Sequence, residues 1–320
     1  FPYTTLFRSL LVPRAGRETG VLMDTYLCFD IGGSSLKCAV ADEEGRLFHT
    51  RSYPMSADIE GLLAYMKAYK KDITMQGVDL SGVAISSCGA VNCDSGVIGG
   101  SSAVPFIHGF SWKERIQREL GLCCEIENDA NCAALSELFY GKAKNIQDMA
   151  FLVIGTGVGG AIVRNRNICH GAHRYGGEFG MMLVKQPDGS VQNFSLCAST
   201  SSMVRKMEAL TGEEWNGVRI FEEAQQGNEL CSKVIQTFYE ELAFGVFNVQ
   251  HMLDPEMILF GGAISARRDF TQRIMEAYEK LQKGLDFATL TPHLECCTYR
   301  QDANLLGALA HYRQRKGLAE

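Results

Sequence analysis

Short apolar runs of strand length alternate along this chain with longer segments whose apolar residues recur at helical spacing. In residues 59–69, Ile59, Leu62, Leu63 and Met66 fall on one helical face, which predicts an amphipathic helix. In the first half of the chain, the same pattern predicts strands at 26–29, 36–42, 47–53, 83–86 and 124–126. It also predicts further helices at 112–120 and 130–140. This order of elements is typical of an α/β protein.

The second half repeats that plan. Its expected strands are 150–154, 160–164 and 257–260, and its expected helices are 200–211, 218–226, 229–251, 269–281 and 303–315. A chain of 320 residues also favours two domains. We therefore expect a duplicated α/β architecture with a first lobe at 23–132, a second at 133–300, and a terminal helix in 301–320 that packs back on the first lobe.

Residues 1–22 show no clear periodicity, and Leu-Val-Pro-Arg at 11–14 looks like a protease-site linker. We interpret this segment as an expression or sequencing scar and leave it out of the fold. A signal peptide is the alternative, but a long apolar region and a clear cleavage site are both lacking.

The composition argues against some classes of binding partner. A net charge of −6 argues against nucleic acid or an anionic membrane surface, and no apolar run approaches the ~20 residues that a membrane span needs. The twelve cysteines include no CxxC pair, and several lie in apolar runs, so we read them as reduced thiols of a cytoplasmic protein.

Two glycine-rich segments, 29–37 and 152–160, each follow an apolar run and turn tightly. Such turns let backbone N–H groups approach phosphate oxygens, so the pair suggests a nucleotide held from two lobes. The first segment adds Asp30, which could hold Mg²⁺ directly or through water, and Lys37, which could neutralise phosphate charge. A turn-capping aspartate and a solvated lysine are the alternative reading.

Acidic residues stand at two further turns. Asp129, with Asn128 before it, lies between a strand and a helix and could act as a general base, or could only cap the helix expected from 130. Glu178 stands among glycines that would let a sugar approach, although a solvated loop glutamate fits equally well. Three histidines near these loops, His108, His170 and His173, lack the spacing of a metal site.

Six motifs in this order resemble those of the ROK family, the bacterial sugar kinases and sugar-responsive repressors with a two-lobed actin-like (hexokinase-like) ATPase fold. The resemblance covers residues 26–312 and rests on Asp-Ile-Gly-Gly-Ser at 30–34, Glu-Asn-Asp-Ala-Asn at 127–131, Gly-Thr-Gly-Val-Gly-Gly at 155–160, Gly-Gly-Glu-Phe-Gly at 176–180, Asp-Pro-Glu and Phe-Gly-Gly-Ala-Ile-Ser within 254–265, and Leu-Leu-Gly-Ala at 305–308.

The resemblance implies ATP-dependent phosphorylation of the primary hydroxyl of a hexose, with ATP and Mg²⁺ as cofactors and a homo-oligomer, a dimer in the family, as the assembly. It places the general base at Asp129 and sugar contacts at Asn128, Glu178, Gly89 and the position of Ala103. ATP binding falls on two phosphate loops and an adenosine turn, namely Asp30, Gly32, Gly33, Ser34, Lys37, Gly155, Thr156, Gly157, Gly159, Gly160, Gly261 and Gly262, with Asp30 also facing Mg²⁺.

This chain departs from the family pattern near the sugar. Met181 stands where members usually carry a histidine, Ala103 where they carry a sugar-contacting asparagine, and Ser195 near the place of a glutamate. The stretch 186–202 holds only Cys197, where members carry a cysteine-rich zinc motif, so no zinc is expected. These changes leave the hexose open, with β-glucosides and N-acetylmannosamine as the alternatives to glucose.

Two other functions are alternatives to the kinase. A repressor of this family carries a winged helix-turn-helix before the first glycine loop, and residues 1–25 are too short for its three helices. A non-catalytic relic that binds sugar or nucleotide is the second alternative, since Met181 and Ala103 remove two sugar contacts. We expect the kinase, because Asp30, Asp129 and Thr156 are all present.

Overall fold

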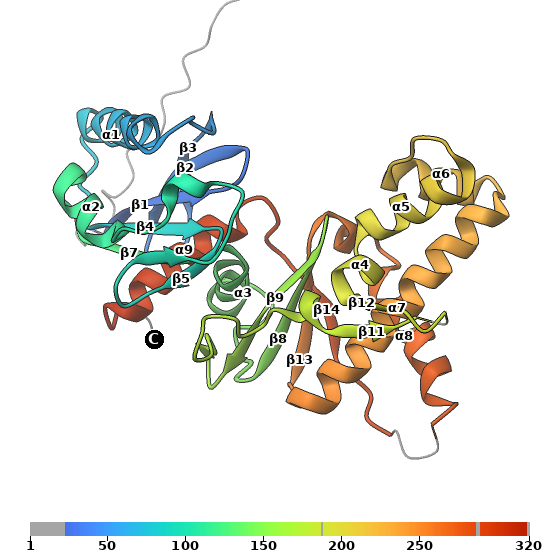
Figure 1. Ribbon diagram of the computed structural model, residues 1–320. Helices are drawn as coiled ribbons and strands as arrows, with labels where there is room; N and C mark the ends of the chain where they lie inside the picture. The colour runs from blue at the N-terminus through green and yellow to red at the C-terminus, as the bar shows by residue number, and fades with distance from the viewer. Residues whose placement is uncertain (1–22, 187, 286–288, 319–320) are drawn as a thin grey trace, which may run out of the picture.

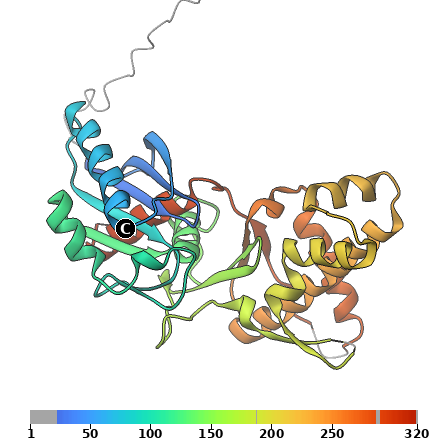
Figure 2. The same cartoon turned by 45° about the horizontal axis from the view of Figure 1, so that its top comes forward.

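The computed structural model describes residues 23–186, 188–285 and 289–318, which form two lobes, each built on a five-stranded sheet (Figures 1 and 2). The first sheet has the order β3 (Leu47–Pro54), β2 (Ser35–Asp42), β1 (Thr25–Ile31), β4 (Gly82–Ser87) and β7 (Cys124–Asn128). The second has the order β10 (Asn167–Ile168), β9 (Val158–Arg164), β8 (Met149–Ile154), β13 (Met257–Gly261) and β14 (Leu294–Cys296).

Both sheets follow one pairing scheme. A glycine hairpin joins two antiparallel strands in each, β1 with β2 and β8 with β9, and a third antiparallel strand lies outside them. The other two strands of each sheet run parallel to the hairpin's first strand. The carboxyl ends of parallel strands therefore meet at one edge of each sheet, which is where α/β proteins place ligands.

Alternate residues of β1 enter different layers of the first lobe, as the pleat of a strand requires. Phe29 packs with Tyr69 of α1 (Ile59–Met75) and Trp112 of α2 (Trp112–Leu120), all fully buried. On the opposite face, Tyr26 packs against Tyr312 of α9 (Ala303–Arg315), with ring centroids 5.2 Å apart. The C-terminal helix thus covers a sheet from the chain's beginning, as the red helix among blue strands in Figure 1 shows.

The second sheet is also covered on both faces. On one face, Phe260 of β13 packs against Phe270 of α8 (Phe270–Gln282), in a core that also contains residues of α7 (Glu229–Leu253). On the other face, Leu259 belongs to a cluster that contains residues of α3 (Asp129–Phe139). Three further helices complete this lobe, α4 (Phe194–Ala198), α5 (Thr200–Thr211) and α6 (Gly217–Gln225).

Two short hairpins and several 3-10 turns lie in stretches that the hydrophobic pattern left as loops. The hairpins are β5 (Ala90–Asn92) with β6 (Val97–Gly99), and β11 (Leu183–Lys185) with β12 (Val191–Asn193). Strands of three residues are too short to show a period. The turns are Pro105–Ile107, Phe179–Met181 and Ala263–Ala266.

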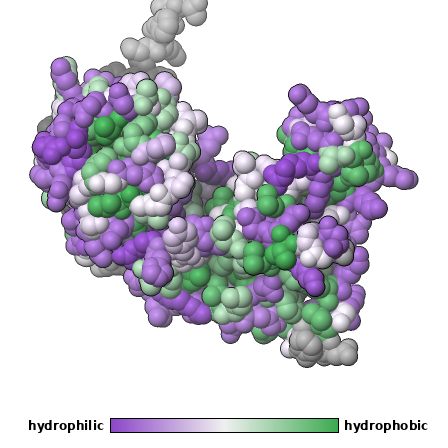
Figure 3. All heavy atoms as spheres, in the orientation of Figure 1, coloured by the Kyte–Doolittle hydropathy of each residue, from purple (hydrophilic) through white to green (hydrophobic). Residues whose placement is uncertain are grey.

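Helices α3 and α9 cross closely at the junction of the lobes. A Cβ on Gly307 of α9 would collide with the backbone carbonyl of Cys132 in α3, so only glycine fits this crossing without a shift. The surface in Figure 3 is hollowed between the lobes. Within the part of the chain that the structure describes, no helix has both the length and the apolar character needed to traverse a bilayer.

Candidate active site

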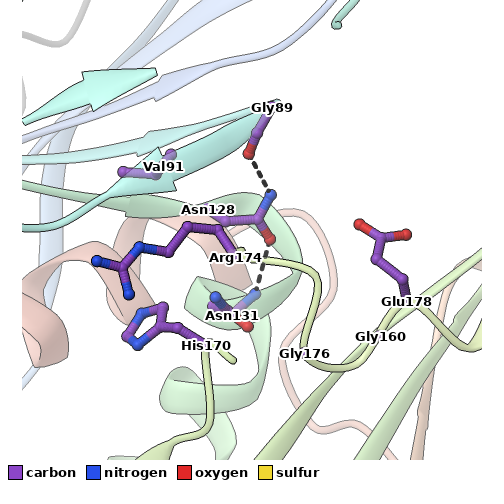
Figure 4. Close-up of a pocket in the computed structure, with 9 residues that line it drawn as sticks. All are labelled: Gly89, Val91, Asn128, Asn131, Gly160, His170, Arg174, Gly176 and Glu178. Atoms are coloured by element: carbon purple, nitrogen blue, oxygen red, sulfur yellow. Dashed lines mark hydrogen bonds between the residues drawn. The ribbon is translucent and has the colours of Figure 1, made fainter. Parts of the chain in front are cut away.

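A small pocket lies where the end of the first sheet meets the second lobe (Figure 4). The pocket is open to solvent and is lined mostly by polar groups. The residues around it come from both halves of the chain: Gly89, Val91, Asn128 and Asn131 from the first, and Gly160, His170, Arg174, Gly176 and Glu178 from the second. Of the predicted sugar-binding residues, Asn128, Glu178 and Gly89 are therefore together.

Asn128, the last residue of β7, is the N-cap of helix α3. Its side-chain oxygen accepts hydrogen bonds from the N–H groups of Ala130 at 2.9 Å and Asn131 at 3.2 Å, and its amide nitrogen donates to the carbonyl of Gly89 at 3.0 Å. The helix thus begins at Asp129, one residue earlier than expected, and Asn128 rather than Asp129 supplies the cap. One N–H of Asn128 is left to meet a ligand in the pocket.

Asp129 is partly exposed on the first turn of α3, and its Oδ1 accepts a hydrogen bond from the N–H of Ala130 at 2.9 Å. Burial raises its pKa from 3.8 to about 6, and the negative charges of Asp30 and Glu178 add to that rise. At neutral pH the carboxylate is ionised, and it holds a proton more strongly than an ordinary aspartate does. That combination suits a general base.

Asp30 is the last residue but one of β1, near the carboxyl end of the strand, and its charge acts on Asp129. Its Oδ1 accepts hydrogen bonds from Ser86 and Asn304, both at 3.0 Å, and its Oδ2 lies 3.7 Å from Nζ of Lys37. Oδ1 is thus hydrogen-bonded within the protein, and Oδ2 faces only the charge of Lys37. An oxygen donor of this kind fits Mg²⁺ held directly or through water, the arrangement that Mg²⁺ prefers.

The first glycine turn leads away from Asp30 towards solvent. Gly33 and Ser34 are exposed, and a hydrogen bond from the N–H of Gly32 to the carbonyl of Ser35 at 3.1 Å closes the turn. Ala103 lies against it, with its Cβ 3.2 Å from where a Cβ on Gly33 would stand. The structure therefore puts Ala103 beside the predicted first phosphate loop and outside the set of residues that surround the pocket.

Residues at the start of α4 and α5 form hydrogen bonds to the second glycine turn, which lies between β8 and β9. Ser195 accepts a hydrogen bond from the N–H of Val158 at 2.9 Å, and Thr200 donates from both its N–H and its hydroxyl to the carbonyl of Gly155. Thr156 at the tip is exposed. Gly157 follows it there, and Gly159 and Gly160 continue into β9.

The third glycine turn adjoins the second. Gly262 has φ of +92°, and a Cβ there would collide with the carbonyl of Ile154, the residue before Gly155. Gly261 ends β13, which runs parallel to β8. The predicted adenosine turn and the predicted second phosphate loop are thus neighbours, as the two ends of one nucleotide require.

Glu178 is exposed and lies across the pocket from Asn128 in Figure 4. The loop before it needs glycine, because Gly177 has φ of +90° and packs directly on the backbone of Ala161. Two large apolar side chains flank Glu178, Tyr175 and Met181, with 62% and 63% of their surface exposed. Neither is among the residues that surround the pocket.

The contact between Glu127 and His170 beneath the pocket was not predicted from the sequence. Glu127 is fully buried, accepts a hydrogen bond from the N–H of Asn128 at 2.7 Å, and lies 2.6 Å from Nε2 of His170. Although burial opposes ionisation, the bond to His170 and the nearby His311 lower the pKa of Glu127 to about 2. The sequence showed Glu127 only as the first residue of the Glu-Asn-Asp-Ala-Asn motif, and nothing in it pointed to a contact with His170.

The chain resembles known proteins in sequence and in fold. The chain is 34% identical to the beta-glucoside kinase of Listeria monocytogenes, over 91% of this chain and 98% of that protein. Its structure matches that of a ROK family protein from Streptococcus pneumoniae in complex with sucrose, with a TM-score of 0.85, 40% identity, and coverage of 92% and 99% of the two chains. A second match is a Listeria monocytogenes protein for which N-acetylmannosamine kinase activity is proposed, with a TM-score of 0.80, 32% identity and coverage of 91% and 99%.

The two duplicated α/β lobes, each headed by a glycine hairpin, define the actin-like, hexokinase-like class of ATPase folds, as the sequence predicted. This chain belongs to the ROK family, whose sequence model matches residues 26–315. The expected enzyme class, an ATP-dependent carbohydrate kinase, is confirmed through the kinase names of its curated relatives.

Proposed function

We propose that this protein transfers the γ-phosphoryl group of ATP to the primary hydroxyl of a hexose derivative, with Asp129 as the general base. The observation that supports the proposal best is the position of Asp129. It stands at the carboxyl edge of the first sheet beside the pocket, within electrostatic reach of Asp30 on the nucleotide side and Glu178 on the sugar side.

The nucleotide would lie between the two glycine hairpins, with its adenosine end at Gly261 and Gly262. Backbone N–H groups at these turns, together with Lys37, would stabilise charge on the phosphates. Asp30 would hold Mg²⁺, which neutralises phosphate charge when bound. Those residues act by position and charge, so the one proton transfer falls to Asp129.

Asp129 would take the proton of the sugar hydroxyl as the hydroxyl oxygen attacks phosphorus. Its Oδ1 is fixed by the N–H of Ala130, which leaves Oδ2 to face the hydroxyl. Glu178 and the remaining N–H of Asn128 would bind sugar hydroxyls from opposite sides of the pocket. Closure of the lobes on the sugar would exclude water and limit hydrolysis of ATP.

For the substrate, we infer that Tyr175 and Met181, exposed on either side of Glu178 in sequence, form an apolar rim around the sugar, which favours a hexose that carries an apolar or bulky group. An apolar wall discriminates weakly against substituents, whereas a site that hydrogen-bonds every hydroxyl rejects them. The name of the Listeria relative suggests a β-glucoside, and an N-acylated hexose is the second candidate.

The test is release of ADP from ATP with a panel of glucose, aryl β-glucosides, cellobiose, N-acetylmannosamine and N-acetylglucosamine. We expect a substituted hexose to have a higher kcat/KM than glucose. We also expect NMR of the product to show the phosphate on the oxygen of the primary hydroxyl. Glucose as the best substrate would refute the apolar-rim argument. Binding of ATP and sugar without ADP release on any hexose would make the protein a non-catalytic relic.

A further inference from the structure

A cluster of three side chains beneath the pocket, two of them buried and one partly exposed, has the donor set of a metal centre. Sγ of Cys93, Oε2 of Glu127 and Nε2 of His170 lie close together, with Sγ–Oε2 at 3.2 Å, Sγ–Nε2 at 3.4 Å and Nε2–Oε2 at 2.6 Å. We propose that this cluster binds a divalent transition metal ion such as Zn²⁺.

The geometry of the three atoms suits such an ion. A point equidistant from them lies about 1.8 Å from each, so an ion about 1 Å out of their plane has bonds of about 2.0–2.3 Å, the range for zinc with sulfur, nitrogen and oxygen. Thiolate and imidazole ligands select zinc and related metals, whereas Mg²⁺ and Ca²⁺ take oxygen ligands. The cluster is thus distinct in chemistry from Asp30.

Side chains around the cluster hold the ligands in place. Oε1 of Glu127 accepts hydrogen bonds from the N–H of Asn128 at 2.7 Å and from the side chain of Asn131 at 3.0 Å, which turns Oε2 towards Cys93 and His170. Hydrogen bonds from neighbouring groups to a ligand side chain commonly orient metal ligands in this way. Cys93 and Glu127 are buried, and His170 borders the pocket, so an ion has a way in.

Without a metal, the same atoms form a hydrogen-bonded triad in which the thiol of Cys93 donates to Glu127. Metal binding replaces the thiol proton, which is released to solvent. The ion would join the β5–β6 hairpin and β7 of the first lobe to the loop of the second lobe that carries Glu178. The three ligands lie 34 and 43 residues apart in sequence, and none of them falls in the 186–202 stretch, where members of the family carry the zinc motif.

The probe is Co²⁺ added to chelator-treated, reduced protein without nucleotide or sugar. We expect one Co²⁺ per chain, a thiolate-to-cobalt charge-transfer band in the near ultraviolet, loss of that band on adding Zn²⁺, and a higher Tm with Zn²⁺. Cys93→Ser should abolish the band. Cys169→Ser, which removes a partly exposed thiol next to His170, should retain it.

His170→Ala gives a second test should Cys93→Ser fail to fold, because this histidine lies on a loop at the pocket edge and its loss should weaken Co²⁺ binding by at least tenfold. Absence of both the band and stoichiometric binding in the wild-type protein would mean a hydrogen-bonded triad only. A band that survives in Cys93→Ser or in His170→Ala would place the metal elsewhere. Either result overturns the proposal.

Discussion

At the scale of single residues, the neighbours Asn128 and Asp129 divide two tasks that the sequence could not assign. Either residue type can cap a helix, and either can meet a ligand. The structure commits the side-chain oxygen of Asn128 to the cap and leaves Asp129 with one oxygen free. The cap therefore anchors the turn on which the proposed base stands.

Glu178 offers a prediction at the same scale. Glu178→Gln should raise KM for the sugar about 10–100-fold, because a hydrogen bond to a charged group contributes about 1.5–3 kcal/mol. The KM for ATP should stay unchanged, which steady-state kinetics at saturating partner concentrations can measure. Glu214→Gln, at an exposed loop position, is the matched control. An unchanged sugar KM in the Glu178 variant would remove this residue from the sugar site.

At the scale of elements, the crossing of α3 and α9 fixes the junction of the lobes. Gly307→Ala should lower the free energy of unfolding by about 1–3 kcal/mol, because its Cβ must displace the backbone of Cys132. Gly217→Ala is the control, since no atom lies within 4 Å of its Cβ at the start of α6. Denaturant unfolding of both variants is the measurement, and equal stabilities would show that the helices separate without cost.

The hydrophobic pattern predicted the long elements well and the short ones poorly. A helix expected at 229–251 is α7, Glu229–Leu253, because many turns display the period clearly. Strands β11 and β12 escaped prediction since each has three residues, and Leu183 and Val191 on them are exposed. Local sequence carries little information where pairing alone makes the strand.

At the scale of the whole molecule, the site is assembled from segments far apart in the chain. Motifs drew attention to Asp30, Asn128, Asp129 and Glu178, and in the folded chain Asn128 and Glu178 border one pocket while Asp30 and Glu178 lie close enough to raise the pKa of Asp129. No local pattern could bring Cys93 and His170 to Glu127, since their contact depends on how the two lobes meet. Such clusters become visible only in the folded chain.

The central claim is that the two lobes present a sugar hydroxyl and ATP to Asp129. The most direct test is kcat of Asp129→Asn with the best hexose of the panel, beside Asp79→Asn, an exposed change on the turn before β4. The account predicts that Asp129→Asn lowers kcat by ~10²–10⁴ while the Kd for ATP and the fold are unchanged, and that Asp79→Asn behaves as wild type. Near-normal turnover in a folded Asp129→Asn protein would contradict it.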